Sequence, residues 1–288
     1  MKKYTFNMLG FILGLFILNL IFIIILKDSI YTREYEAVKL GYKTYLLSDS
    51  HGLPLEDSLE NVGIFNFAAG SDSYYDIYRK VSFLIKNTDV ERIIISVEDH
   101  TLSEQRANSN NLDRSLYYAD QEDFNSIYEF ITKKYIINNL PLLSSKRRYF
   151  IKHCLQFKFS PPQKGYILKD WSKLPLHKKK EMCTNRYNVQ FQNRKKSNSL
   201  VSSLKDIINI CKVNNIEIIG IKFPLSRDYI ATIGNKNFGA DSLFYENNIK
   251  VLDLKDLYLR NDNYFSDEDH LNIIGGKIFS EFLVNLLK

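Results

Sequence analysis

Two short segments near opposite ends of the chain carry side chains that together could activate a hydroxyl group. Ser50 follows Asp49 in a turn directly after a short apolar run, and His270 lies three residues after Asp267, just before the last predicted helix. An imidazole that a carboxylate orients can take the proton of a serine hydroxyl, which then becomes a nucleophile. The pattern therefore indicates acyl-transfer chemistry, with Ser50 as nucleophile, His270 as base and Asp267 as the orienting acid.

Each segment also has an ordinary structural interpretation. A serine in a glycine-containing turn usually caps a helix or closes the turn, and Asp267 could equally cap the final helix and interact with its dipole. The positions of the two segments favour the chemical interpretation, since one follows the first predicted strand and the other precedes the last predicted helix. In a parallel sheet both places lie at the carboxyl edge, so we expect Ser50 and His270 to meet there.

The elements that must position these residues alternate between strands and helices. β-Branched runs such as 92–97 predict strands that are buried on both faces, and apolar residues at helical spacing predict amphipathic helices between them. This alternation favours an α/β fold in three αβα layers, with a parallel, flavodoxin-like sheet. The predicted strands are 44–47, 62–67, 92–97, 216–223 and 249–254. The predicted helices between and after them are 72–86, 199–213 and 273–287, and a further helical piece is predicted around 123–135.

The beginning of the chain indicates a membrane. Residues 9–26 contain no charge, and as a helix they would extend about 27 Å, close to the ~30 Å of the hydrocarbon layer. Two lysines precede them, so we expect 1–8 in the cytoplasm and the catalytic domain on the extracytoplasmic side. A cleaved signal peptide is the alternative, but its apolar region would be shorter and followed by small residues. We interpret 9–26 as a single-pass transmembrane signal anchor, followed by a stalk over 27–39 and the α/β domain over 40–288.

The segment from about 101 to 196 interrupts the alternation of strands and helices, and we interpret it as an insertion or lid. Within it, residues 146–196 contain 15 Lys and Arg against two acidic residues, a net charge of +13 in a chain whose total is +6. Such a charge run is either a solvated face or a surface that attracts anionic lipid head groups or an acidic glycan. We expect no nucleic acid partner, because the predicted topology places this segment outside the cytoplasm.

Composition excludes several other classes of protein. A hydrophobic fraction of 45% excludes a wholly disordered chain, and 12 glycines with 6 prolines exclude collagen-like and low-complexity architectures. The 3 cysteines lie far apart in the sequence, so they indicate neither a disulfide framework nor a metal site.

The motifs and their order resemble the SGNH, or GDSL-like, hydrolase superfamily over most of the chain after the predicted anchor. The Gly-Asp-Ser of the family's first block is matched by Ser48, Asp49 and Ser50. Its last block, Asp-x-x-His before a hydrophobic residue and a helix, is matched by Asp267 and His270. The resemblance implies a Ser-His-Asp triad on a flavodoxin-like sheet.

The two middle blocks of the family match less closely. The second, a strand that ends in Asn before a glycine-containing turn, is similar to the segment from Asn66 to Gly70, which implies that the backbone N–H groups of Ser50 and Gly70 bind the oxyanion. The third normally carries Gly-x-Asn-Asp, but Glu98 and Asp99 stand here. Ionised carboxylates cannot donate, so the asparagine donor of the family is missing. The chain is similar in this respect to a divergent, membrane-anchored branch that includes alginate O-acetyltransferases and the D-alanine transfer protein of teichoic-acid assembly.

Further polar residues near these motifs are candidates for the wall of a pocket. His51 directly follows Ser50, so we expect its side chain to point elsewhere, and His100 could line the site or only cap its loop. A zinc site built from both of these histidines with Asp99 and His270 is conceivable, but no two of the four have helical ligand spacing, so we predict no metal. The candidate pocket residues are Asp49, His51, Asn66, Asp99 and His100.

The resemblance implies serine-dependent acyl-ester chemistry at the cell envelope, without a cofactor. The expected partner is a cell-envelope polysaccharide or another acylated glycan, to which an acyl group would be transferred or from which it would be removed. The membrane tether favours transfer from a donor that a multi-span membrane acyltransferase supplies. Two alternatives stay open, which are a catalytically silent glycan-binding assembly factor and a metal-dependent hydrolase.

Overall fold

A computed structural model describes the chain except for residues 1, 28–29, 56–58, 138–139, 141–169 and 288. The chain divides into a larger unit, formed by 39–112 with 163–288, and a smaller unit, formed by 1–38 with 113–162. Part of the predicted insertion, including much of its basic and aromatic stretch, lies outside the described residues.

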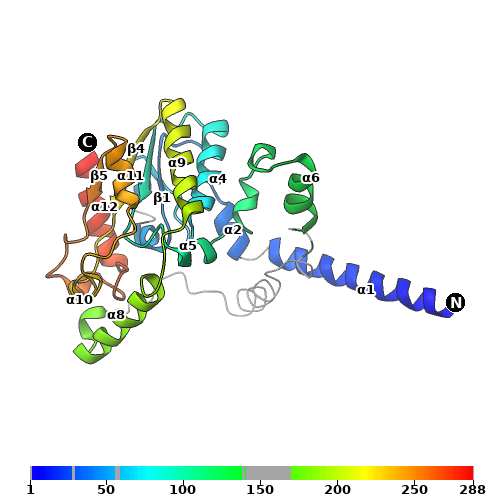
Figure 1. Ribbon diagram of the computed structural model, residues 1–288, viewed down its shortest axis with the longest axis horizontal. Coiled ribbons are helices and arrows are strands. Elements are labelled where there is room, and N and C mark those ends of the chain that lie inside the picture. Colours follow the sequence, from blue (N-terminus) through cyan, green and yellow to red (C-terminus); the bar gives the residue numbers. More distant parts are fainter. Residues whose placement is uncertain (1, 28–29, 56–58, 138–139, 141–169, 288) are drawn as a thin grey trace. The chain divides into compact units, whose positions relative to one another are not determined.

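The larger unit is built around a five-stranded parallel sheet with the strand order β2-β1-β3-β4-β5 (Figure 1). This order reverses direction between β1 and β3, which in open parallel sheets is the place where ligands bind. The predicted α/β class and each of the five predicted strands are confirmed. The strands are β1 (Thr44–Leu47), β2 (Ile64–Asn66), β3 (Arg92–Ser96), β4 (Glu217–Lys222) and β5 (Val251–Asp253).

Helices cover both faces of this sheet. On one face, the short 3-10 helix η1 (Ser50–Leu55) packs against the last helix, α12 (Ile273–Leu287). On the other face, α4 (Tyr74–Asn87) and α9 (Asn198–Val213) lie side by side, and α11 (Ala240–Glu246) contacts α9 and β5 (Figure 1). The predicted three-layer arrangement is therefore observed.

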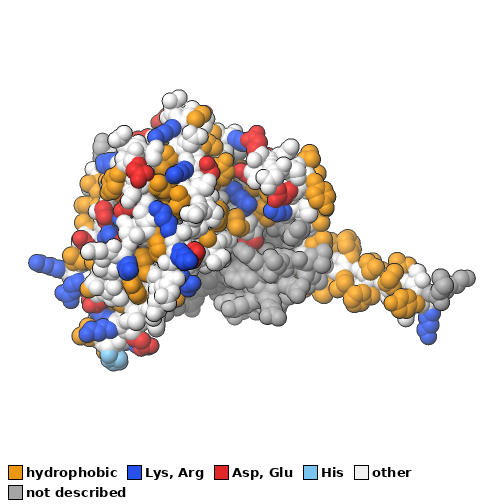
Figure 2. All heavy atoms as spheres, in the orientation of Figure 1, with side chains coloured by type: hydrophobic (Ala, Val, Ile, Leu, Met, Phe, Trp, Pro, Cys, Tyr) orange, Lys and Arg blue, Asp and Glu red, His pale blue; other side chains and the backbone are white. Residues whose placement is uncertain are grey.

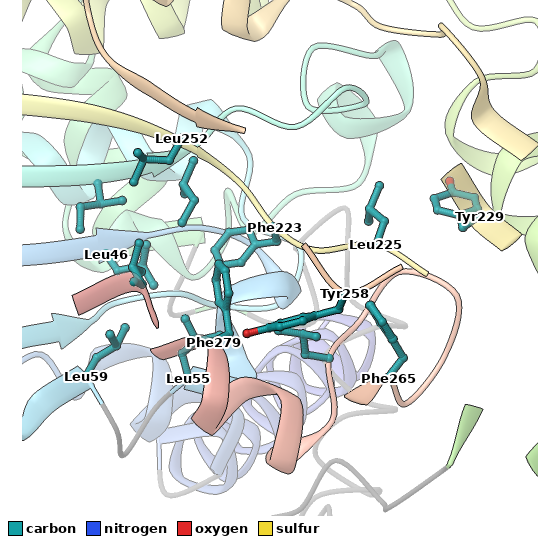
Figure 3. Close-up of a cluster of buried hydrophobic side chains, with 14 of the residues drawn as sticks. Leu46, Leu55, Leu59, Phe223, Leu225, Tyr229, Leu252, Tyr258, Phe265 and Phe279 are labelled. Carbon is teal, nitrogen blue, oxygen red and sulfur yellow. The ribbon is translucent and has the colours of Figure 1, made fainter. Parts of the chain in front are cut away.

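Buried apolar side chains fill the space between the sheet and the layer of η1 and α12 (Figure 3). Leu46 and Leu252 come from strands, Phe223 follows β4, and Leu55 and Phe279 come from the two helices. Side chains alternate between the faces of a strand, so the neighbours of these strand residues point to the opposite helical layer. The core thus holds η1, which begins with Ser50, against the carboxyl half of the sheet.

Four α-helices in the described part of the larger unit were not among the predicted elements. They are α5 (Glu104–Asn108), α8 (Leu176–Gln190), α10 (Arg227–Ile233) and α11, whose bounds are given above. α8 packs against α10, and its sequence has no continuous apolar stripe that would have predicted it. The predicted insertion begins and ends at adjacent points of the larger unit, because Ser103 and Lys196 form an antiparallel bridge.

The smaller unit contains the helix that was predicted to span a membrane. α1 (Lys2–Lys27) is longer than the predicted 9–26, and residues 3–25 are long and apolar enough to cross a membrane, as an anchor or a signal sequence would be. Its apolar side chains are exposed on the face shown in Figure 2. The amide of Asn19 donates to the backbone oxygen of Leu15 (2.9 Å), so it is satisfied inside the helix.

The other described helices of the smaller unit are short. Tyr118 donates a hydrogen bond to the backbone oxygen of Tyr35, and the guanidinium of Arg114 lies 4.5 Å from the centre of the Tyr35 ring. These contacts join the segment after α1 to the segment after residue 112. The helices are α2 (Ile30–Glu36), η2 (Ser115–Tyr117), η3 (Gln121–Asp123), α6 (Ile127–Phe130) and the π-helical η4 (Ile131–Ile137).

Gly276 provides a test of the close packing between η1 and α12. A Cβ atom on Gly276 would lie 2.2 Å from the backbone oxygen of Pro54, so Gly276→Ala must push the two helices apart. We expect a loss of about 1–3 kcal/mol in the free energy of unfolding, measured by denaturant titration of the full chain in detergent. Gly41→Ala is the matched control, since nothing lies within 4 Å of its added methyl group. Equal stability of the two variants would contradict the close packing.

Candidate active site

The two predicted motifs meet at the carboxyl edge of the sheet. The hydroxyl oxygen of Ser50 lies 2.8 Å from Nε2 of His270, although 220 residues separate them in the sequence. The other ring nitrogen of His270, Nδ1, lies 2.9 Å from Oδ1 of Asp267. Hydroxyl, imidazole and carboxylate therefore form a continuous hydrogen-bonded chain, an arrangement in which the imidazole can accept the hydroxyl proton.

A second carboxylate, absent from the predicted set, shares the Nδ1 atom of His270. Oδ1 of Asp269 also lies 2.9 Å from this nitrogen, and its side chain is 1% exposed, against 27% for Asp267. Two acceptors at Nδ1 place the ring proton there and leave Nε2 to accept from Ser50. Burial alone would lower the pKa of His270, but the charge of Asp269 and the hydrogen bonds at Nδ1 raise it to about 9.

The loop that carries His270 is fixed by its own polar groups. Oδ1 of Asp267 accepts the backbone N–H groups of Asp269 (3.1 Å) and His270 (2.8 Å), so this carboxylate both orders the turn and contacts the imidazole. The N–H of Ser266 donates to the backbone oxygen of His270 (2.9 Å). The side chain of Asn272 caps the start of α12 and binds the preceding loop. The imidazole is thus held on an ordered turn.

The turn that carries Ser50 depends on a glycine and on Asn66. A Cβ atom on Gly52 would lie 2.3 Å from Oγ of Ser48 and 2.8 Å from Cβ of Ala68, so η1 can approach the ends of β1 and β2 only with glycine here. The amide of Asn66 donates to the backbone oxygen of Gly52 (2.7 Å), and its oxygen accepts the N–H of Ala68 (3.1 Å). Asn66 therefore supports the Ser50 turn.

The loop after β2, which contains Gly70, is anchored by a buried polar network. The amide of Asn111 donates to the backbone oxygen of Gly70 (2.8 Å) and to Oδ1 of Asp72 (2.6 Å). The other carboxylate oxygen of Asp72 pairs with the ammonium of Lys80 at 2.6 Å. Burial nevertheless raises the pKa of Asp72. No distance in the structure tests whether the N–H of Gly70 binds an oxyanion, so that role stays a prediction.

The expectation that His51 points away from the site is wrong. Its ring stacks on that of His270, with ring centres 4.6 Å apart and planes 13° from parallel. Ser50 and His51 begin a 3-10 turn, in which consecutive side chains diverge by about 120° instead of pointing to opposite faces as in a strand. Both can therefore reach His270, Ser50 at the ring edge and His51 at the ring face.

Three carboxylates surround His51, two of them from strand ends and one from the loop before α12. Its Nδ1 lies 2.7 Å from Oδ1 of Asp49 and 2.9 Å from Oε2 of Glu98, and its Nε2 lies 3.7 Å from Oδ2 of Asp269. Burial alone would lower the pKa of His51, but these negative charges hold it well above its usual value. Burial opposes ionisation of Asp49 too, yet the charge of His51 and its hydrogen bonds keep the pKa of Asp49 well below its usual value.

Two predicted pocket residues after β3 face different partners. Asp99 pairs with the ammonium groups of Lys222 and Lys255, both at 2.7 Å. These ion pairs commit Asp99 to the lysines and place it outside any ligand set with His51. His100 instead lies 3.7 Å from Oδ2 of Asp49 through its Nε2 atom.

The structure contains a small hollow beside these residues, and apolar and aromatic side chains line it together with charged ones. Among the described residues, neither Ser50 nor His270 lines it. The lining residues are His51, Glu98, Asp99, His100, Gln190, Phe191, Leu225, Tyr229, Ile233, Lys255 and Asp269.

Several of these side chains also have the chemistry of metal ligands. Ligand atoms of Asp49, His51, Glu98 and His100 lie within 4.8 Å of one another, as do those of a second group of His51, Asp269 and His270. Two imidazoles with two carboxylates form a donor set that suits zinc. The set conceived from the sequence differs, because it contained Asp99 in place of Asp49 and Glu98.

Helix α8 holds the loop that carries the imidazole. The guanidinium of Arg186 lies 2.8 Å from Oε1 of Glu268 and 3.2 Å from Oδ1 of Asp269, while Gln190 donates to Oδ2 of Asp269 (3.2 Å). Burial alone raises the pKa of Glu268, and the adjacent charge of Asp269 raises it further. Arg186 therefore compensates two buried carboxylates directly before His270.

These supporting residues differ in the signal that they leave in the sequence. Asp269 stands beside His270, so the run Asp-Glu-Asp-His contained a signal for a second carboxylate. Arg186 and Asn111 reach the site from distant elements, and no local spacing connects them to it. In the sequence, Arg186 is one of the many basic residues of 146–196 and nothing distinguishes it from the others.

Comparisons with known proteins give remote structural similarities. No protein-family model matches the sequence, and no curated protein matches it. Among solved structures, the chain is similar to a putative lipolytic protein of the G-D-S-L family from Desulfitobacterium hafniense, with 12% identity and a TM-score of 0.40 over 84% of this chain and 99% of that one.

Two further structures show the same degree of similarity. A putative acylhydrolase from Bacteroides fragilis has 9% identity and a TM-score of 0.40, over 90% of this chain and 95% of that one. A GDSL-like lipase from Bacteroides thetaiotaomicron has 9% identity and a TM-score of 0.42, over 90% and 97%. At these identities, the activity of the chain has to be inferred from its own side chains.

Arg186 provides a test of how α8 supports the site. Arg186→Gln leaves Glu268 and Asp269 buried without their cation, so we expect the free energy of unfolding to fall by about 2–3 kcal/mol. The loss should be larger at pH 8 than at pH 5, because protonation of the carboxylates at low pH removes the uncompensated charge. Lys178→Gln on the same helix breaks an exposed ion pair with Glu181 and should cost less than about 0.5 kcal/mol. Equal losses of stability in both variants would contradict the role of Arg186 in compensating Glu268 and Asp269.

Proposed function

We propose that the chain carries out serine-dependent acyl-ester chemistry at the cell envelope, in the form of O-acyl transfer to, or removal from, a cell-surface polysaccharide. The observation that carries this proposal is the contact between Ser50 and His270, with carboxylates at the far side of the imidazole. This geometry supports the proposal, because a nucleophile, a base and an orienting acid have to lie together in this way.

The proposed reaction begins with attack of the Ser50 hydroxyl oxygen on the carbonyl carbon of an acyl ester or thioester. The hydroxyl proton passes to Nε2 of His270, and Asp267 with Asp269 stabilises the imidazolium through Nδ1. Collapse of the tetrahedral intermediate returns that proton to the leaving group and leaves the acyl group on Ser50. A sugar hydroxyl or a water molecule then attacks the acyl-serine, with His270 again acting as base.

The oxyanion in this proposal is bound by the backbone N–H groups of Ser50 and Gly70. The side chains that replace the family's asparagine cannot supply this donor, since Glu98 lies against His51 and Asp99 against two lysines. A site with backbone donors alone loses one stabilising interaction, which in other enzymes corresponds to roughly 10²–10³ in rate. A modest turnover number is therefore part of the proposal.

The apolar helix α1 supports location of this chemistry at a membrane. As a signal anchor it would keep the site close to the bilayer, where a partner membrane protein could deliver an acyl donor. Tethering raises the local concentration of donor and acceptor, which favours transfer over hydrolysis. The substrate and partner are proposed on this basis and on the chemistry of the site.

Ser50 is tested by its reactivity with a fluorophosphonate probe. The full chain in detergent should be labelled at Ser50, and Ser50→Ala should reduce labelling and p-nitrophenyl acetate turnover at least 10²-fold, because the nucleophile is removed. Ser202→Ala, an exposed serine on α9, is the matched control and should keep full reactivity.

Three outcomes separate this proposal from its alternatives. Equal turnover by the native chain and Ser50→Ala, with loss on addition of a chelator, would indicate a metal-dependent hydrolase. Absence of both labelling and turnover in the native chain would indicate a catalytically silent glycan-binding protein. After incubation with an activated acetyl donor, a mass gain of one acetyl group that disappears in Ser50→Ala would support an acyl-enzyme.

The pH dependence of labelling follows from the state of His270. The imidazole must be neutral to accept the Ser50 proton, and its pKa of about 9 means that most molecules carry an imidazolium at pH 7. We expect the second-order rate of labelling to rise about tenfold per pH unit below the pKa and to level off above it. A rate that is flat between pH 6 and 9 would contradict this assignment.

A further inference from the structure

Four side chains of metal-ligand type gather at the carboxyl ends of β1 and β3, next to Ser50. Asp49 follows β1, His51 lies in η1, and Glu98 and His100 follow β3, and each of the four is buried. One ligand atom from each lies within 4.8 Å of the others. Because the two segments are far apart in the sequence, no ligand spacing indicates the set, and the sequence alone predicted no metal.

Glu98 carries a buried oxygen that the described side chains leave unsatisfied. Its Oε2 atom accepts no hydrogen bond from the described residues. It nevertheless lies 2.9 Å from Nδ1 of His51 and 4.0 Å from Nδ1 of His100, so it is aimed between the two imidazoles. The proton of His51 Nδ1 is donated to Oδ1 of Asp49 instead, at 2.7 Å. A buried charged oxygen without a hydrogen bond is strongly unfavourable, which points to a positively charged ligand at this place.

We propose that Asp49, His51, Glu98 and His100 bind one zinc ion in a structural site that joins the ends of β1 and β3. Two imidazoles and two carboxylates form a donor set that suits zinc. The protein would take all four positions of a tetrahedral ion, as in structural sites, whereas a catalytic zinc keeps one position open. The site is independent of the proposed acyl chemistry, and the metal has no part in that reaction.

The distances between the four side chains fit ligands of a common ion. With metal bonds of about 2.0–2.2 Å, neighbouring ligand atoms around a tetrahedral zinc lie roughly 3.3–3.6 Å apart. His51 lies 2.7 Å from Asp49 and 2.9 Å from Glu98 through Nδ1. His100 lies 3.7 Å from Asp49 through Nε2 and 4.0 Å from Glu98 through Nδ1. These distances bracket the tetrahedral value, so small side-chain adjustments would bring the four donors onto one ion.

The surroundings of His51 suit an imidazole that binds a metal through Nδ1. Its Nε2 atom is buried, has no hydrogen-bond partner in the described part of the chain and lies 3.7 Å from Oδ2 of Asp269. Metal-binding histidines usually direct their second ring N–H at a carboxylate, which fixes the orientation of the ring. With zinc at Nδ1, the proton of His51 would be on Nε2 and would face Asp269 in this way.

The charges around this group also favour a divalent cation. Arg106 lies 3.5 Å from Oδ2 of Asp49, but the same nitrogen donates to the backbone oxygen of Asp72, so it neutralises Asp49 only in part. A proton on His51 supplies one positive charge and one hydrogen bond, whereas zinc supplies two charges and reaches both carboxylates. Carboxylates outnumber guanidinium groups here, with Asp49, Glu98, Asp267, Glu268 and Asp269 against Arg106 and Arg186.

The other group that could hold an ion at this edge, His51 with Asp269 and His270, is already engaged. Nε2 of His270 is hydrogen-bonded to Ser50, and the carboxylate of Asp269 contacts both Arg186 and Gln190. An ion there would have to break these contacts, whereas an ion among the four proposed ligands leaves them in place.

Metal content tests the site in the full chain in detergent. After exposure to Zn²⁺ and removal of the unbound ion, the native chain should hold one zinc per chain by inductively coupled plasma mass spectrometry, and so should Ser50→Ala. His51→Gln and Glu98→Gln should bind zinc at least about 100-fold more weakly, since loss of a ligand costs more than loss of a residue that only supports one. His177→Gln and Glu104→Gln, which change exposed side chains, are the matched controls and should keep the ion.

Glu98→Gln also separates metal binding from folding. Because Oε2 of Glu98 accepts no hydrogen bond from the described residues, the neutral side chain of the same shape should leave the metal-free chain as stable as the native one. With free Zn²⁺ at about 100 times the native dissociation constant, the unfolding equilibrium constant of the native chain should fall about 100-fold, and that of Glu98→Gln by about twofold at most.

Three results would overturn the proposal. They are absence of stoichiometric zinc from the native chain, retention of zinc by folded His51→Gln and Glu98→Gln, and loss of zinc in His270→Gln but not in Glu98→Gln. Fluorophosphonate labelling of Ser50 tests the proposed function separately. A chain that binds zinc and is not labelled refutes only that function, and a chain that is labelled and binds no zinc refutes only this site.

Discussion

The hydrogen bond between Ser50 and His270 exists because a parallel sheet brings the first strand and the last loop to the same edge. Each residue sits at the start of a segment whose position the core determines, since η1 and α12 pack against one another on one face of the sheet. Their contact is close enough that glycine is required where α12 passes Pro54. A change in the packing of these two helices would therefore alter the distance between hydroxyl and imidazole directly.

Charge is the second constraint on this edge of the sheet, because several carboxylates are buried there and each needs a cation. Asp99 has two lysines, Glu268 has Arg186, and Asp49 has His51. Arg186, Lys222 and Lys255 come from parts of the sequence distant from their carboxylate partners, so these charges join separate elements as well as neutralising one another. α8 therefore supports the loop that carries His270, whereas its composition indicated only a solvated or anion-attracting surface.

The sequence was sufficient to predict the sheet and the contact between Ser50 and His270, because both leave local signals. The run 92–97 is apolar and β-branched, and Ser50 and His270 stand at recognisable ends of elements. The orientation of His51 was predicted wrongly, since alternation between opposite faces holds for strands and fails in the 3-10 turn that begins at Ser50. The part played by Arg186 could not be predicted, because its contact with Asp269 depends on how α8 folds back onto the sheet.

Under the proposed function, the same arrangement affects the oxyanion, because no asparagine donor follows β3. Glu98 lies against His51 there, and Asp99 lies against two lysines. The negative charges that replace the donor would repel an oxyanion if they were uncompensated. His51, Lys222 and Lys255 remove most of that repulsion, and in the proposed mechanism the backbone N–H groups can then stabilise the oxyanion without opposition from the strand end.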